Sequence, residues 1–192
     1  MRNLVLPYYV QPIKYLDIKV DSSKPTIGIS ECLSESLVRY DGKSEYKPNL
    51  INVLKQSFNL LTVCPEVECG LGVPRPPVEL VENADMIKVI GRDDASIDVS
   101  QKLKSYAKQK VSVLGDLSGY IFKARSPSCG LMSTPIFNSK KEIVRLSSGI
   151  FAEALVQTYP SLPVIENESL DNDKNLKIFI DTVNQYFQLN NK

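Results

Sequence analysis

Residues 60–66 read LLTVCPE, a continuous apolar run that ends directly at Cys64. A short run of this kind is typical of a strand buried on both faces of a parallel sheet. The run TIGIS at 26–30 has the same character and ends just before Cys32, and GYIFKA at 119–124 is a third strong strand pattern. The sequence therefore predicts three core strands, each of which leads into a loop that contains a cysteine.

Helical patterns separate these strands. Pro48 suits the first turn of a helix, and apolar residues at helical spacing follow it as far as Phe58. Asp98 and Gln101 resemble a capping box, which predicts a helix from Asp98 through about Val113.

Two more helices are predicted near residues 150–158 and 176–189, and the segments VELVE (78–82) and MIKVIG (86–91) are predicted to be short strands. Strands that alternate with helices in this way indicate an α/β fold, with a mostly parallel sheet and flanking helices.

The chain has 192 residues, which is enough for one domain with its own hydrophobic core. We expect a short N-terminal extension over residues 1–24 and the main domain over residues 25–165. Residues 166–192 are expected to hold a surface linker, the acidic and polar stretch 166–175, followed by the C-terminal helix.

The formal net charge is +1, so composition alone indicates no bulk attraction for nucleic acid or for an anionic membrane. No apolar run approaches the roughly 20 residues that span a bilayer, and the N-terminal residues lack the pattern of a secretory signal. We therefore expect a cytoplasmic protein whose thiols stay reduced.

The sequence contains no histidine, which excludes Ser-His-Asp triads, Cys-His dyads and histidine-ligated metal sites. Proton transfer must then rest on carboxylates, lysine, hydroxyls, thiols or water. A transition-metal site must be built mainly from thiolates, which favours zinc, copper(I) or iron–sulfur.

The spacing of the four cysteines fits none of the compact metal-binding motifs. However, the carboxyl ends of parallel strands meet at one edge of a sheet, so Cys32, Cys64 and Cys129 are expected to converge there. The loop SPSCG at 126–130 is expected to present N–H groups inward as an anion-binding nest. The alternative is that each cysteine is a small buried apolar residue, and this is the favoured interpretation for Cys69, which ends no strand.

Four sequence blocks resemble the thiouracil desulfurase family. They are GISECL (28–33), VRYDG (38–42), VCPEVECGLGVPRPPVEL (63–80) and FKARSPSCG (122–130). The resemblance extends over roughly residues 25–165. The segment 149–164 also resembles family members that carry a second domain, which is not part of this sequence.

The resemblance implies a [4Fe–4S] cluster that is bound only by Cys32, Cys64 and Cys129. One iron then lacks a protein ligand and is open to the sulfur of a C=S group. The implied reaction is a non-redox desulfuration of a thiolated pyrimidine, in which thiouracil or thiouridine becomes the oxo form and sulfide is released. The resemblance leaves Cys69 out of the ligand set.

Three residues beside these ligands are candidates for catalysis. Glu66 is the candidate acid or base, and its alternative roles are to cap a helix or to pair with Arg75. Ser126 and Ser128 flank Cys129 and are candidates for positioning the pyrimidine or the water, although serines beside proline also stabilise turns. Arg75 and Asp41 lie in family blocks and are expected to hold the architecture of the site.

Three alternative functions remain open at this point. A structural zinc or iron–sulfur module without catalysis would form if Cys69 joined the other three cysteines in a closed site. A redox-active disulfide protein is less favoured, because the sequence has no C-x-x-C motif. Transfer RNA is an alternative substrate, but the near-zero net charge gives no phosphate footprint, so a free thiopyrimidine or a nucleoside is favoured.

Overall fold

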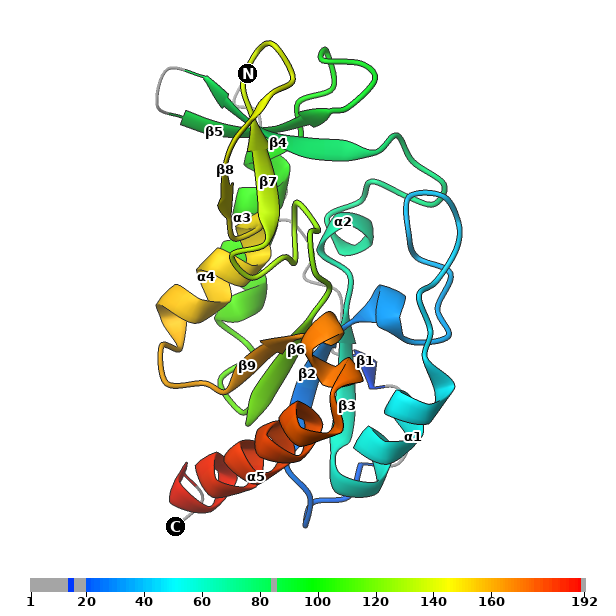
Figure 1. Cartoon of the computed structure of the whole chain (residues 1–192), viewed down its shortest axis with the longest axis vertical. Helices are drawn as coiled ribbons and strands as arrows, with labels where there is room; N and C mark the ends of the chain where they lie inside the picture. The colour runs from blue at the N-terminus through cyan, green and yellow to red at the C-terminus, as the bar shows by residue number, and fades with distance from the viewer. Residues whose placement is uncertain (1–13, 16–19, 84–85, 191–192) are drawn as a thin grey trace, which may run out of the picture.

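The computed structural model describes residues 14–15, 20–83 and 86–190, which form two sheets with helices packed around them (Figure 1). Most of the expected N-terminal extension lies outside the described residues. The described part of the chain contains no helix with the length and apolar character needed to cross a membrane.

The larger sheet has the strand order β1-β3-β2-β6-β9. Its strands are β1 (Lys14–Tyr15), β2 (Thr26–Ser30), β3 (Asn59–Val63), β6 (Gly119–Phe122) and β9 (Val164–Glu166). All neighbouring pairs are parallel except β1–β3 at the edge, which is antiparallel. The predicted α/β class with a mostly parallel sheet is therefore confirmed.

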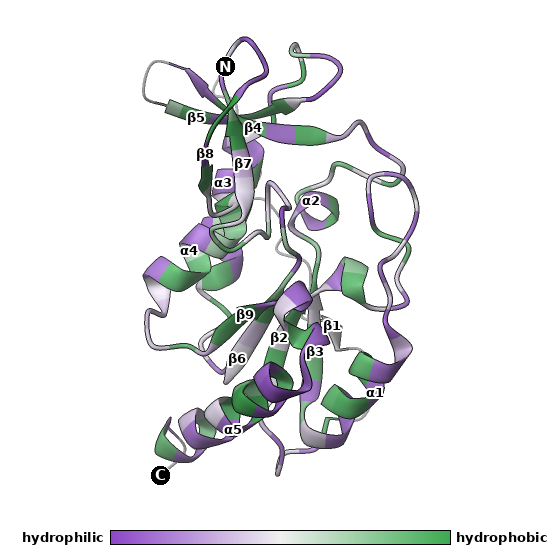
Figure 2. Cartoon of the chain, viewed as in Figure 1, coloured by the Kyte–Doolittle hydropathy of each residue, from purple (hydrophilic) through white to green (hydrophobic). Residues whose placement is uncertain are grey.

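Helices cover both faces of this sheet. The longer ones are α1 (Pro48–Ser57), α3 (Ser100–Val111), α4 (Ile150–Thr158) and α5 (Asp173–Asn190). Buried residues of β2 such as Ile27 form one core with α1 and α5, whereas Leu61 and Tyr120 form a second core with α3 and α4. Figure 2 shows apolar residues in strands such as β9 and in parts of helices such as α1 and α5.

The smaller sheet has the order β5-β4-β7-β8 and was only half predicted. It contains β4 (Val78–Asn83), β5 (Met86–Gly91), β7 (Thr134–Phe137) and β8 (Ile143–Ser147). The first two strands are confirmed. The other two strands were not predicted, because β7 includes Pro135 and β8 is almost wholly exposed and so lacks a buried apolar pattern.

The start of α3 corrects the predicted capping box. The N-cap is Val99, with no side-chain cap, and the helix begins at Ser100. Asp98 Oδ1 accepts a hydrogen bond from the Ser100 N–H at 3.0 Å, while Gln101 Nε2 donates to Ser105 Oγ at 3.1 Å. The glutamine therefore bonds along the helix instead of returning to its N-terminus.

Residues 166–175 lie mostly at the surface, as expected, but they form short elements instead of a plain linker. Glu166 ends β9, residues Asn167–Asp171 form the 3-10 helix η2, and α5 begins at Asp173. Asn167 is buried and its Oδ1 accepts a hydrogen bond from the Ala124 N–H at 2.9 Å. The polar composition of this segment reflects side chains that bind neighbouring loops rather than solvent alone.

Gly28 provides a test of the packing in the centre of the sheet. A Cβ at this position would lie 2.2 Å from Cδ2 of Tyr120, a fully buried ring on the neighbouring strand. We expect Gly28→Ala to lower the free energy of unfolding by about 1–3 kcal/mol, because the ring has no room to move. Urea denaturation measures this change.

Gly115→Ala is the matched control, since its added Cβ would meet only the Tyr159 hydroxyl at 3.5 Å. The free energy of unfolding of this variant should stay close to that of the wild type. Equal stability of the two variants would contradict the packing argument.

Candidate functional site

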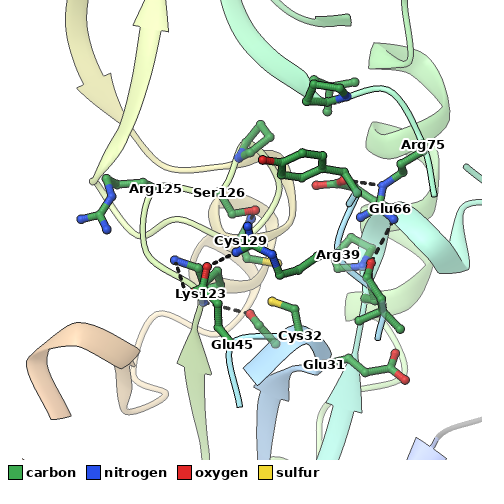
Figure 3. A pocket seen from close by; sticks show the side chains of 18 of the residues that line it. Glu31, Cys32, Arg39, Glu45, Glu66, Arg75, Lys123, Arg125, Ser126 and Cys129 are labelled. Carbon is green, nitrogen blue, oxygen red and sulfur yellow. Dashed lines mark hydrogen bonds and ion pairs between the residues drawn. The ribbon is translucent and has the colours of Figure 1, made fainter. Parts of the chain in front are cut away.

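A cavity of about 280 Å³ lies at the carboxyl ends of β2, β3 and β6. Cys32, Cys64 and Cys129, from three segments far apart in the sequence, all line it. Figure 3 shows Cys32 and Cys129 facing this space from two sides. The structure thus brings together the three cysteines that the sequence analysis singled out.

Each cysteine lies in a different local structure. Cys32 lies in the 3-10 helix η1 (Glu31–Leu33), and its carbonyl accepts a hydrogen bond from the Glu45 N–H at 2.7 Å. Cys64 follows β3 directly as the N-cap of the short helix α2 (Pro65–Glu68). Cys129 lies in the loop that follows β6.

The loop at 126–130 is rigid but is not the predicted nest. Ser126 Oγ accepts hydrogen bonds from the N–H groups of Ser128 (3.3 Å) and Cys129 (3.1 Å). The Gly130 N–H donates to the Ser126 carbonyl at 2.8 Å. The prediction of inward-facing N–H groups is therefore wrong for these three residues, because their donors bond within the loop.

The same loop is docked on the N-terminus of α4. The first N–H groups of the helix, from Ile150 and Phe151, donate to the carbonyls of Pro127 (3.1 Å) and Ser128 (2.9 Å). Gly149 makes this approach possible, since a Cβ there would lie 2.5 Å from the Ser128 carbonyl carbon. The helix needs no side-chain cap because the cysteine loop supplies the acceptors.

Glu66 connects two of the cysteine-bearing segments. Its Oε2 accepts a hydrogen bond from Arg75 Nε at 2.8 Å, and its Oε1 accepts one from Ser128 Oγ at 2.9 Å. Glu66 and Arg75 line the cavity. Ser128 is buried (1% exposed), and its hydroxyl donates to the glutamate. The alternative role considered for Glu66, pairing with Arg75, is present in the structure, and Ser128 donates to Glu66 instead of lining the cavity.

Arg75 also joins the surrounding loops. Its Nη1 donates to the Val38 carbonyl at 2.9 Å and its backbone N–H donates to the Tyr40 carbonyl at 3.0 Å. Asp41 is further from the chemistry: it is exposed and accepts hydrogen bonds from Arg39 and from the Lys43 N–H. Of the two residues expected to hold the architecture, Arg75 contacts the site and Asp41 shapes only the adjoining loop.

A second charged group on the cavity wall was not predicted. Lys123 Nζ pairs with Glu45 Oε2 at 3.1 Å, and Glu45 also pairs with Arg39. Burial lowers the pKa of Lys123. These residues come from two loops with no sequence motif in common, and only the fold places them together.

Behind Cys64 lies a buried ion pair that the sequence analysis also missed. Glu68 Oε2 accepts hydrogen bonds from Lys110 Nζ and from the Tyr106 hydroxyl, both at 2.8 Å, and the charged side chains are each 1% exposed. Glu68 Oε1 accepts the Cys64 N–H at 3.1 Å. The available signal was Lys110 itself, which lies seven residues after Leu103 on the core-facing side of α3.

All three cavity thiols favour the neutral form. Burial raises the pKa of Cys32 to about 11 and that of Cys64 to about 12. Burial also raises the pKa of Cys129 well above its usual value, and negative charge on Cys32 or Cys64 would raise it further. Binding of a positively charged group in place of their protons therefore favours the thiolate form.

Cys69 lies apart from this arrangement. It is buried in the apolar core with residues such as Leu103 and does not line the cavity, and its Sγ donates to the Glu66 carbonyl at 3.3 Å. Across the described ranges, no three histidine, cysteine or acidic side chains are grouped as they would be around one metal ion. The three cavity cysteines instead border a shared space.

Comparisons with known proteins found a matching family model and a similar solved structure. A family model described as 2-thiouracil desulfurase matches residues 27–167. A solved structure of a [4Fe-4S]-dependent thiouracil desulfidase, TudS, is similar with a TM-score of 0.61 and 28% sequence identity, over 77% of this chain and 94% of that one. No curated protein matches the chain.

The Glu68–Lys110 pair generates a stability prediction. Lys110→Met leaves an unpaired carboxylate in the core, so we expect the free energy of unfolding to fall by about 3–5 kcal/mol. Lys108→Met, on the exposed side of the same helix, should change it by less than about 0.5 kcal/mol. Urea denaturation of both variants checks the difference, and a small effect at Lys110 would show that the pair is not needed.

Proposed function

Because the chain belongs to the 2-thiouracil desulfurase family, as the sequence blocks indicate, we propose that it replaces the sulfur of a thiolated pyrimidine by oxygen with a [4Fe–4S] cluster held by Cys32, Cys64 and Cys129. The observation that carries this proposal is that the three cysteines line one cavity at the edge of the parallel sheet. The similar solved structure, TudS, is described as a [4Fe-4S]-dependent thiouracil desulfidase.

The donor set suits the cluster. Thiols are the ligands of iron–sulfur clusters, and these three are free, without disulfide bonds. They line one cavity of about 280 Å³, which has room for a cluster of several atoms. When bound through three thiolates, such a cluster supplies an iron without a protein ligand, which acts as a Lewis acid toward thiocarbonyl sulfur.

Glu66 is the proposed acid–base residue. In the overall reaction, water converts the C=S group to C=O and hydrogen sulfide is released. Protons must therefore move, although no net electron transfer occurs. Arg75 and Ser128 each donate to one oxygen of the Glu66 carboxylate, and each oxygen keeps a further lone pair. Glu66 is therefore able to accept a proton from water and to return it at the departing sulfur.

The two serines have different proposed roles. Ser126 lines the cavity and its oxygen accepts two backbone N–H groups, which leaves its hydroxyl proton to donate to the pyrimidine. Ser128 fixes the Glu66 carboxylate and is a positioning residue. The arrangement supports Glu66 as the catalytic carboxylate, with Ser126 on the side of the substrate and Ser128 on the side away from the cavity.

The alternative of a closed four-thiolate structural site is not supported. It requires Cys69 as the fourth ligand, and Cys69 lies in the apolar core away from the cavity. A free thiopyrimidine or a nucleoside remains the proposed substrate.

Removal of the ligands tests the cofactor. After anaerobic reconstitution, we expect about four irons per chain in the wild type and release of sulfide from thiouracil. Cys32→Ala, Cys64→Ala and Cys129→Ala should each lose the iron and the activity. Cys69→Ala is the matched control and should keep both, so loss of iron only in this variant would overturn the ligand assignment.

Substitution of the carboxylate tests the chemistry. In cluster-loaded protein, Glu66→Gln should lower kcat for sulfide release by about 10²–10⁴, because a general acid–base residue contributes a factor of this size. The visible spectrum of the cluster should be unchanged. Glu82→Gln, on the smaller sheet, is the control and should keep full activity.

Ser128→Ala should show a smaller loss of kcat than Glu66→Gln, since the carboxylate remains and only its orientation is disturbed. An active Glu66→Gln variant with the full cluster would exclude Glu66 as the acid–base residue and leave the cluster assignment intact.

A further inference from the structure

Lys123 lines the same cavity as the three cysteines, and the reaction proposed above gives it no role. It directly follows β6, and its side chain is largely buried (13% exposed). Lysine is mostly an exposed residue, so a buried lysine beside a cavity is a candidate for binding a polar group of the ligand.

The backbone of Lys123 is fixed by two buried polar side chains. Its N–H donates to Ser30 Oγ at 3.0 Å, and the N–H of the next residue, Ala124, donates to Asn167 Oδ1 at 2.9 Å. Ser30 and Asn167 are both buried. The lysine side chain therefore starts from a backbone that neighbouring elements hold in place, as a binding group requires.

The ammonium group is also held, but two printed partners do not use all of its donors. Nζ donates to Glu45 Oε2 at 3.1 Å and to the Ala124 carbonyl at 3.0 Å. Glu45 is itself tied to the cysteine segment, because its N–H donates to the Cys32 carbonyl at 2.7 Å. A charged lysine has three N–H donors, so one remains for a group in the cavity.

The other basic side chains of the cavity wall are matched by carboxylates or exposed. Three ion pairs account for Arg39 with Glu45, Arg75 with Glu66, and Arg125 with Glu168. Arg92 is exposed. Lys123 combines burial with a donor that its partners leave open.

Lys123 and Glu66 line the cavity from different sides, with Cys32 and Cys129 between them in the view of Figure 3. A ring held beside the cysteines would therefore meet a proton acceptor on one side and a cationic donor on the other. In thiouracil, one ring N–H separates the reacting C=S group from a carbonyl group, whose oxygen is an acceptor. That carbonyl is the part of the substrate that matches the open donor of the lysine.

We propose that Lys123 is a specificity-determining residue, whose ammonium group donates a hydrogen bond to the ring carbonyl that the reaction leaves unchanged. This inference rests on the proposed function and deepens it. In 2-thiocytosine, an amino group replaces that carbonyl and presents donors to the ammonium group. Lys123 thus selects thiolated uracil over thiolated cytosine, because a buried donor is left unpaired when the acceptor is missing.

Lys123→Met tests the inference in cluster-loaded protein. The variant removes the donors and keeps an apolar stem, and Glu45 keeps its pair with Arg39. We expect KM for 2-thiouracil to rise about 10- to 100-fold, as for loss of a hydrogen bond from a charged donor, with kcat within about threefold of the wild type. The value of kcat/KM for 2-thiocytosine should not fall, so the preference for the uracil ring should decrease.

Binding of uracil gives a second readout that does not depend on turnover. Uracil has the ring carbonyls but no sulfur, and calorimetry with the loaded protein should give a Kd about 10- to 100-fold higher for Lys123→Met. The iron content and the visible spectrum should match those of the wild type.

Lys47→Met is the matched control, because Lys47 also pairs with a carboxylate, that of Asp171, but does not line the cavity. It should leave KM, the preference between the two bases and uracil binding unchanged. Glu45→Gln keeps the lysine and weakens its hold, so KM for 2-thiouracil should rise by a smaller factor. This variant decides the question should Lys123→Met fail to fold.

Unchanged KM and unchanged uracil binding in loaded Lys123→Met would overturn the inference and leave Lys123 in a structural ion pair, while sulfide release by the wild type still supports the proposed function. An equal loss with both bases, or a lower kcat at unchanged KM, would also overturn it, because Lys123 would then act on something other than the ring carbonyl. If the wild type releases no sulfide from 2-thiouracil, the proposed function fails first and this inference falls with it.

Discussion

The parallel pairing of β2 with both β3 and β6 is the constraint on which the site depends. Ile29 pairs with Thr62 on one side and with Ile121 on the other, so the three strands run in the same direction. They end at the same edge of the sheet. Cys64 follows its strand at once, Cys32 lies in the next turn, and Cys129 lies in a longer loop. An antiparallel partner in either position would carry one cysteine to the opposite edge.

Strand direction alone does not fix the thiols, and the loops that carry them are held by contacts with buried groups. Glu66 joins the Cys64 segment to the Cys129 loop through Ser128, and Arg75 extends this connection to the backbone of the loop at Val38. From the other side, Glu68 holds the backbone of Cys64 against α3. Glu66 therefore links the segments that carry Cys64 and Cys129.

The elements that could be predicted from the sequence are those whose signal lies within a short stretch of residues. The strands at 26–30 and 60–63 are apolar runs, and Pro48 marks the start of α1, so the signal for each lies within its own few residues. The strands β7 and β8 could not be found, since one contains a proline and the other is solvated. The Glu68–Lys110 pair and the Lys123–Glu45 pair join residues that only the tertiary fold brings together.

The loop at 126–130 does not form the predicted anion nest, which limits how its backbone can act on a group in the cavity. The N–H groups of Ser128, Cys129 and Gly130 are satisfied inside the loop, so they give rigidity and no direct stabilisation of negative charge. Side chains such as Glu66, Ser126 and Lys123 supply polar groups to the cavity. The smaller sheet completes the wall through Val78, at the start of β4, and Arg92, just after β5. A rigid backbone that presents a few side chains allows the substrate to be recognised without rebuilding the loops that hold the cysteines.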